Sequence, residues 1–270
     1  MTLYIVPTPV GNLGDITRRA VEVLSQVDFI IAEDSRYSRK LLSHLGIRKR
    51  IVSHYRPREE AQSDQIVAML ERESGALITD SGTPTISDPG FILVRKAIDA
   101  GITVVPLPGP TAFIPALAAS GIDPRRFLFL GFPPRAKGEL RRCLKELASL
   151  PFSLVFYESP RRLEDLLGSA AEAFGDRDFA LAKEISKKHE RIVRGRLGRW
   201  REALQAEPLL GEMVLIVAGS PEDGNREAPP ELHSIDDLYA FFHRRFGIGK
   251  NALKKVLMKK KAKLPPGHAG

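Results

Sequence analysis

Cysteine is almost absent from this chain, which has a single thiol, Cys143, among its 270 residues. A disulfide framework and a metal site built on cysteine are therefore excluded. The six histidines are scattered along the sequence, and no pair of them has the spacing of metal ligands. We therefore expect no bound metal.

Long uninterrupted hydrophobic runs are also missing. The most apolar stretch, residues 104–122, contains four prolines, which would break a membrane-spanning helix. A strand, a loop and a helix are expected there instead. The N-terminus has no basic start and its apolar run ends at Pro7, unlike a secretory signal peptide. These features predict a cytoplasmic protein that does not enter a membrane.

Two common nucleotide-binding signatures are absent. No Gly-x-Gly-x-x-Gly follows the first expected strand, and Gly-x-x-x-x-Gly-Lys-Ser/Thr occurs nowhere in the sequence. Hydride transfer from a dinucleotide and hydrolysis of a nucleoside triphosphate therefore lose most of their support.

The positive charge that the chain does have is concentrated at one end. Residues 231–270 hold nine Lys and Arg against three Asp and Glu, which gives +6 of the formal net charge of +8. A basic segment of this kind suits a polyanion such as nucleic acid. A solvated tail that only aids solubility is the alternative, because lysine-rich ends are common.

The first hundred residues alternate short apolar runs with amphipathic segments. In residues 59–73, for example, Ile66, Val67 and Leu70 form an apolar stripe with helical spacing. The alternation predicts a largely parallel sheet with helices on both faces. The expected strands are 3–6, 29–32, 51–54, 76–79 and 103–107, and the expected helices are 15–26, 38–44, 59–73 and 91–99.

The second half mixes hairpin-like neighbours with crossovers, which predicts a mixed sheet. Its expected strands are 127–130, 153–157, 179–185, 190–195 and 212–218, and its expected helices are 137–148, 162–173 and 197–205. A linker rich in Gly, Pro and charge then precedes two further helices, 235–246 and 252–261. We predict an N-terminal α/β domain (1–110), a C-terminal α/β domain (111–220) and a basic helical extension (231–270).

Three loops that are rich in proline and glycine follow strands of the first expected sheet, at residues 7–14, 80–90 and 108–112. Ligands of open α/β sheets bind beyond the carboxyl ends of the strands. Proline stiffens such loops, and glycine lets a ligand approach the backbone. Asp80 and Asp88 are possible hydrogen-bond acceptors for a ligand, although an Asp before a helix is often only its N-cap. The residues alone thus predict a two-domain α/β enzyme with a small-molecule cleft.

The motifs in and around these loops resemble those of the tetrapyrrole methylase superfamily and, within it, the ribosomal RNA small subunit methyltransferase I family. The likeness extends over about residues 3–220, and AEDSRYSRKLL and DSGTPTISDPG point to the RNA subgroup. The matching segments are LYIVPTPVGNLG (3–14), DITRRA (15–20), AEDSRYSRKLL (32–42), DSGTPTISDPG (80–90), VVPLPGPTA (104–112), GFPP (131–134), FYESPRRL (156–163), AKEIS (182–186) and GEMVLIV (211–217).

The resemblance implies two α/β domains of the tetrapyrrole-methylase type with S-adenosylmethionine bound in the cleft between them. It also implies a homodimer that methylates the ribose 2′-hydroxyl of a cytidine in the decoding region of 16S ribosomal RNA, on the small ribosomal subunit. Two alternatives stay open. One is a tetrapyrrole methylase of the precorrin or sirohaem type, and the other is a noncatalytic ribosome-binding module that has kept the fold.

The candidates for catalysis and for donor binding come from the matched motifs. For catalysis they are Lys183, Glu158 and Asp34, and a partly desolvated Lys183 could act as a base or stabilise an alkoxide. The alternative for each is a salt bridge at the end of a strand. The donor-binding candidates are Val10, Gly11, Asp80, Ser81, Gly82, Ile86, Asp88, Thr111, Ala112, Tyr157, Ala182 and Met213. The RNA-binding candidates are Arg36, Arg39, Lys40, Arg135, Lys137, Arg161 and Arg162.

Overall fold

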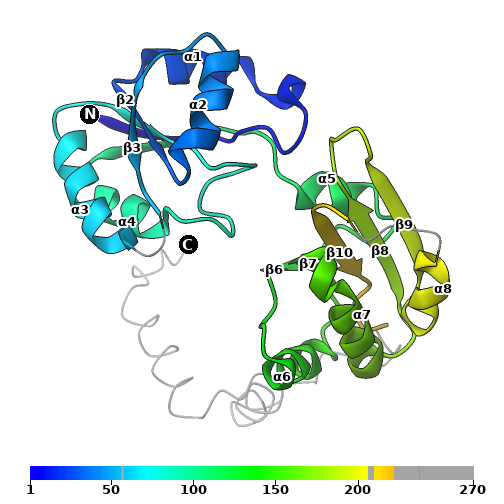
Figure 1. The fold of residues 1–270 in the computed structure, drawn as a ribbon. Coiled ribbons are helices and arrows are strands. Elements are labelled where there is room, and N and C mark those ends of the chain that lie inside the picture. Colours follow the sequence, from blue (N-terminus) through cyan, green and yellow to red (C-terminus); the bar gives the residue numbers. More distant parts are fainter. Residues whose placement is uncertain (56–57, 206–209, 222–236, 238–270) are drawn as a thin grey trace, which may run out of the picture. The chain divides into compact units, whose positions relative to one another are not determined.

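The computed structural model describes residues 1–55, 58–205 and 210–221, together with Asp237. Residues 1–220 form one unit, in which the described residues build two five-stranded sheets with helices packed on them (Figure 1). The two helices that we predict within 231–270 lie outside the described residues. The predicted domain boundary at residue 110 falls between the last strand of the first sheet and the next helix, and it stays a prediction.

The first sheet is entirely parallel, as the alternation of strands and helices predicted. Its strand order is β3-β2-β4-β1-β5, so β1 and β4 occupy the interior next to one another. The strands are β1 (Thr2–Ile5), β2 (Phe29–Ala32), β3 (Arg50–Ser53), β4 (Gly75–Leu77) and β5 (Thr103–Pro106). The carboxyl ends of β1, β4 and β5 therefore lie side by side at one edge, which brings the loops that follow them together.

Helices cover both faces of this sheet, which confirms the prediction. Ile30 of β2 packs in a cluster with Leu24 and Leu42 on one face, whereas the next residue, Ile31, packs with Ile66 and Leu93 on the other. This alternation is the ordinary two-residue period of a strand buried on both sides. The helices are η1 (Leu13–Asp15), α1 (Arg18–Gln26), α2 (Ser35–His44), α3 (Glu59–Leu70) and α4 (Phe91–Asp99).

Capping fixes where α2 begins. The Asp34 carboxylate accepts a hydrogen bond of 2.7 Å from the backbone N–H of Arg36, so the helix starts at Ser35. The predicted start at Ser38 is three residues too late, because the apolar period alone does not reveal a polar first turn. Asp34, a candidate for catalysis, thus also has a structural role at the carboxyl end of β2.

The second sheet is mixed, as predicted, with the order β6-β7-β10-β8-β9. The pair β6 and β7 is parallel, and the other three neighbouring pairs are antiparallel. The strands are β6 (Phe127–Gly131), β7 (Ser153–Glu158), β8 (Asp178–Lys183), β9 (Arg191–Arg196) and β10 (Met213–Val217).

Alternate residues of this sheet also pack against helices on opposite faces. Phe156 and Leu181 belong to a cluster with α6 (Lys137–Leu147), α7 (Pro160–Phe174), η3 (Leu197–Arg199) and α8 (Trp200–Leu204). Val155, Ala180 and Val214 belong to a cluster with α5 (Phe113–Ala118) on the other face. Helix α5 confirms that the apolar stretch 104–122 is a strand, a loop and a helix.

No helix in the described part of the chain combines the length and the apolar character that crossing a membrane requires.

Candidate active site

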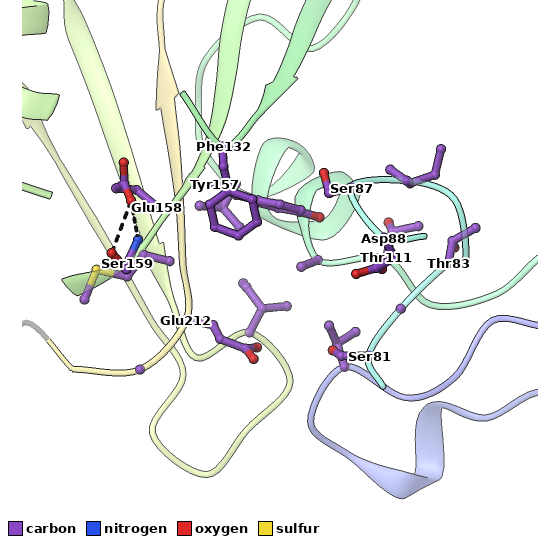
Figure 2. A pocket seen from close by; sticks show the side chains of 18 of the residues that line it. Ser81, Thr83, Ser87, Asp88, Thr111, Phe132, Tyr157, Glu158, Ser159 and Glu212 are labelled. Atoms are coloured by element: carbon purple, nitrogen blue, oxygen red, sulfur yellow. Dashed lines mark hydrogen bonds between the residues drawn. The ribbon is translucent and has the colours of Figure 1, made fainter. Parts of the chain in front are cut away.

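A pocket of about 380 Å³ lies where the loops after β1, β4 and β5 meet residues from the second sheet (Figure 2). Its volume falls in the range of small-molecule sites, which is about 300–1,000 Å³. Its described lining residues are Val10, Ser81, Gly82, Thr83, Ile86, Ser87, Asp88, Thr111, Ala112, Phe132, Tyr157, Glu158, Ser159, Pro160, Ile185, Gly211, Glu212, Met213 and Val214.

Hydrogen bonds tie the three loops to one another. The backbone groups of Thr8 and Gly82 exchange two hydrogen bonds, of 2.8 and 3.0 Å, which joins the first loop to the second. The Thr83 hydroxyl donates to the Pro110 carbonyl at 2.9 Å, which joins the second loop to the third. The loops that the sequence placed after neighbouring strands therefore form one connected wall of the pocket.

The loop between β4 and α4 has unusual backbone conformations. Gly82, Thr85 and Ser87 all have positive φ angles, of 85°, 72° and 71°. Such a conformation costs free energy in residues other than glycine, above all in a β-branched one such as Thr85. Strain of this kind clusters at functional sites, and here Gly82 and Ser87 line the pocket itself.

The charged groups of the pocket are all acidic. Asp88, Glu158 and Glu212 line it, and no Lys, Arg or His is found among its described lining residues. Two of these carboxylates have cationic partners outside the lining, since Glu158 pairs with Arg162 at 3.3 Å and Glu212 pairs with Lys187 at 3.2 Å. A lining whose own charges are all negative still disfavours a polyanion such as a triphosphate or a polycarboxylate. The lining therefore already restricts the class of ligand.

Glu158 is the buried carboxylate of this set. Its side chain is 1% exposed, and its Oε1 atom accepts hydrogen bonds from the Ser159 N–H at 2.8 Å and the Ser159 hydroxyl at 3.2 Å (Figure 2). Its Oε2 atom forms an ion pair with the Arg162 guanidinium at 3.3 Å, and it has no hydrogen-bond partner among the described residues. Glu158 is thus a buried carboxylate held by Ser159 and Arg162.

Lys183 lies in the same row of the sheet as Glu158. Met213 pairs with Glu158 on one side and with Lys183 on the other, so the three residues lie side by side across β7, β10 and β8. Lys183 is buried, with 5% of its surface exposed. It does not line the pocket, whereas Glu158 and Met213 do.

Asp34 and Asp80 follow neighbouring strands and influence one another. Burial raises the pKa of Asp80 above its ordinary value, and the negative charge of Asp34 raises it further. The Asp80 Oδ1 atom is buried and has no hydrogen-bond partner in the described part of the chain. Neither carboxyl group lines the pocket, although Asp80 immediately precedes the lining residue Ser81.

Tyr157 is one of two aromatic side chains, with Phe132, among the described lining residues of the pocket. Burial raises its pKa to about 12, although hydrogen bonds with the backbone of Phe113 and Ala112 oppose the shift. Its ring meets that of Phe129 edge to face, with the centroids 5.0 Å apart. At neutral pH Tyr157 is therefore a neutral phenol in a fixed position.

Nine of the twelve donor-binding candidates line the pocket, and Gly11, Asp80 and Ala182 do not. Ala182 is buried in the apolar cluster beside α5. A Cβ atom on Gly11 would lie 2.2 Å from Cγ of Lys187, so this glycine is needed for close packing of the two segments. The nine that line it are Val10, Ser81, Gly82, Ile86, Asp88, Thr111, Ala112, Tyr157 and Met213.

Sequence reasoning missed several lining residues of the second half, including Phe132, Ser159, Ile185 and Glu212. All four lie in the matched motifs GFPP, FYESPRRL, AKEIS and GEMVLIV. The signal was therefore present, but the motifs did not show which of their side chains face the pocket.

The cationic candidates differ in their surroundings. Arg36, Arg39 and Lys40 are exposed on α2, and none has an ion-pair partner among the described residues. Lys137 pairs with Asp165 at 3.0 Å on the protein surface. These α2 cations keep their charge available for a polyanion.

The remaining three candidates surround the start of α7. Arg162 donates to the Pro134 carbonyl at 2.7 Å as well as pairing with Glu158, so it holds local structure together. Arg135 and Arg161 are exposed, and no ion pair of either is found in the described part of the chain. In the part of the chain that the structure describes, no group of three or more His, Cys, Asp or Glu side chains could hold a metal ion.

A family model described as Tetrapyrrole (Corrin/Porphyrin) Methylases matches residues 2–200. A protein from Haemophilus influenzae named Ribosomal RNA small subunit methyltransferase I is 47% identical over 88% of this chain and 86% of its own length. One of the same name from Bacillus subtilis is 40% identical over 96% of this chain and 88% of its own.

Two solved structures resemble the fold. A uroporphyrin-III-C-methyltransferase from Thermus thermophilus has a TM-score of 0.57 at 20% identity, over 80% of this chain and 94% of its own. A diphthine synthase has a TM-score of 0.63 at 15% identity, over 81% of this chain and 90% of its own. At these identities the likeness is one of fold, and it confirms the predicted fold class.

Proposed function

Because this chain belongs to the tetrapyrrole methylase family and, within it, to the ribosomal RNA small subunit methyltransferase I family, we propose that it methylates small-subunit ribosomal RNA with S-adenosylmethionine as donor. The proposed acceptor is the ribose 2′-hydroxyl of a cytidine in the decoding region of 16S RNA. The observation that carries the proposal is the pocket with only acidic charges, in which nine donor-binding candidates meet.

The residues of the pocket fit this donor. S-adenosylmethionine supplies a methyl group bound to a positively charged sulfur, and it also carries an amine. The carboxylates of Asp88 and Glu212 suit these positive charges, and the hydroxyls of Ser81, Thr83 and Thr111 are short hydrogen-bonding groups. Met213 and Val214 add a buried apolar wall that excludes water.

Of the three candidates for catalysis, Glu158 is the one that lines the pocket, and we assign it the role of base. The proposed proton acceptor is the Oε2 atom, which is ion-paired with Arg162 and has no hydrogen-bond partner among the described residues. A positioned base contributes about 10²–10⁴-fold to rate. Lys183 lies on β8 in the same row of the sheet as Glu158, on the other side of Met213, and we assign it a structural role.

The exposed cations of α2 are proposed to hold RNA phosphates outside the pocket, with Arg135 and Arg161 at its other side. The basic residues 231–270 add a nonspecific electrostatic attraction to RNA. The homodimer that the family resemblance implies is part of the same proposal, and so is the cytoplasmic location predicted from the sequence.

The names of the relatives weigh against the tetrapyrrole alternative, because proteins 40% and 47% identical to this chain are named Ribosomal RNA small subunit methyltransferase I. The noncatalytic alternative predicts neither donor binding nor methyl transfer.

The test measures methyl transfer from the donor to small ribosomal subunits. Small ribosomal subunits from a strain that lacks the gene are incubated with the purified protein and donor labelled in its methyl group, with a precorrin in a parallel reaction. We expect label on one cytidine of 16S RNA, located by mass spectrometry as a 2′-O-methyl group. Label on the precorrin alone, or on neither substrate, would contradict the proposal.

A further inference from the structure

An exposed aromatic ring lies at the mouth of the pocket. Phe132 is 60% exposed and still lines the pocket, whereas the lining residues Met213 and Val214 are 3% exposed. Figure 2 shows Phe132 and Tyr157 together, between Glu158 and Ser159 on one side and Ser87 on the other. Phe132 thus belongs to the outer part of the pocket, where a second ligand would enter.

The backbone holds this ring in place. Gly131, which ends β6, has a φ angle of 61°, and a Cβ atom there would lie 3.0 Å from the Ser87 hydroxyl. Pro133 is buried, and Arg162 donates to the Pro134 carbonyl at 2.7 Å. Because the loop is fixed on both sides of Phe132, the exposure of the ring is a property of the folded loop.

Among the described residues, no aromatic ring is stacked on Phe132. The Tyr157 and Phe132 centroids are 5.6 Å apart, but the rings are tilted by 59°. Single-stranded RNA is commonly recognised by stacking its bases on exposed aromatic rings.

We propose that Phe132 is the stacking platform for the base of the nucleotide whose ribose is methylated. This rests on the proposed function, because it requires an RNA nucleotide to reach the donor. Stacking there holds the base at the mouth while the attached ribose extends inward toward Glu158.

The charges around the mouth fit a nucleotide chain. Arg135 follows Phe132 by three residues, and Arg161 adjoins the lining residue Pro160. Both are exposed, and the ion pairs of the described residues include neither. They can therefore bind phosphates on the outside, which the acidic lining of the pocket cannot do.

The test compares Phe132→Ala and Phe132→Trp with the wild type. KM is measured for small subunits that lack the modification, and the Kd of S-adenosylmethionine is measured by calorimetry. We expect Phe132→Ala to raise this KM about tenfold or more while the donor Kd changes less than about twofold, since stacking contributes mainly to binding of the base. Phe132→Trp, which keeps a flat ring, should retain a KM near that of the wild type.

The matched control is Phe91→Ala, because Phe91 is 68% exposed and does not line the pocket. If Phe132→Ala has an unchanged KM while the wild-type enzyme still labels the RNA, this inference alone is overturned. A rise confined to the donor Kd would place the ring in the donor site and overturn it as well. Absence of RNA labelling by the wild type would instead refute the proposed function and, with it, the stacking platform.

Discussion

The Glu59 carboxylate accepts a hydrogen bond of 2.8 Å from the backbone N–H of Gly90. This bond connects the start of α3 with the residue before α4, 31 positions later in the chain. Gly90 also ends the loop whose residues Ser81–Asp88 include much of the pocket wall. A carboxylate that does not line the pocket thus holds one end of the proposed donor loop.

We predict that Glu59→Ala lowers both stability and donor affinity. Loss of a hydrogen bond to a charged group costs about 1.5–3 kcal/mol, and the freed loop should weaken S-adenosylmethionine binding several-fold. Urea unfolding and calorimetry measure the two effects. The control is Glu60→Ala on the same helix, whose side chain is 79% exposed beside Lys96. Equal effects of the two substitutions would contradict a specific role for Glu59.

A second prediction contrasts Gly82, whose backbone conformation favours glycine, with Gly168, whose helical position favours alanine. Gly82 has a φ angle of 85° and space for a Cβ atom, so Gly82→Ala should cost only the backbone strain, about 1–2 kcal/mol. Because Gly82 lines the pocket, donor affinity should fall too. Gly168 lies within α7 and a Cβ atom there meets nothing within 4 Å. Gly168→Ala should therefore raise stability by about 0.5–1 kcal/mol, with donor affinity unchanged. Thermal unfolding showing the same sign for both would be inconsistent with this account.

The buried His54 predicts a dependence of stability on pH. Burial lowers the pKa of His54, although the charge of Glu59 opposes the shift. The folded state therefore binds this proton less readily than the unfolded state, whose histidine titrates near pH 6.5. As pH falls below about 6.5, the free energy of unfolding should decrease by at most about 1.4 kcal/mol per pH unit.

Urea unfolding of the wild type and of His54→Gln between about pH 7 and pH 5 checks this expectation. Glutamine keeps a polar group near Ser63, whose Oγ lies 2.9 Å from the His54 Nε2 atom. The variant should lose less stability on acidification than the wild type does. Parallel curves would show that His54 makes no contribution.

The role assigned to Glu158 makes a fourth prediction. Glu158→Gln keeps the size of the side chain but removes the carboxylate, so the methylation rate should fall about 100-fold or more. The Kd of the donor should change only a few-fold, because other groups hold it. Single-turnover methylation of small subunits measures the rate. A variant with the rate of the wild type would remove Glu158 as the base and leave Lys183 and Asp34 to be examined in the same way.

The sequence predicted the fold well because its signals are local. The period of apolar residues in 59–73 predicted α3, although the helix ends at Leu70 rather than at Glu73. The alternation of strands and helices likewise predicted a parallel first sheet and a mixed second one. Proline and glycine after three strands placed one wall of the pocket.

The opposite wall was harder to predict, because it depends on which side chain of each motif faces inward. Glu158 and Lys183 looked equivalent in sequence, and they occupy equivalent positions beside Met213, yet only Glu158 lines the pocket. Gly11 packs closely against Lys187, which is distant in the sequence, and no local pattern encodes such a contact. Long-range packing therefore decides what the motifs leave open.

The central claim is that the acidic pocket binds S-adenosylmethionine. The most direct test measures donor binding by calorimetry in a variant whose pocket is filled by a larger side chain. Ala112, the N-cap of α5, lines the pocket, whereas Ala118 at the other end of α5 is exposed and does not. The account predicts that the wild type and Ala118→Phe bind one donor per chain, while Ala112→Phe keeps its unfolding midpoint but loses binding. Donor binding by Ala112→Phe with the affinity of the wild type would contradict the account.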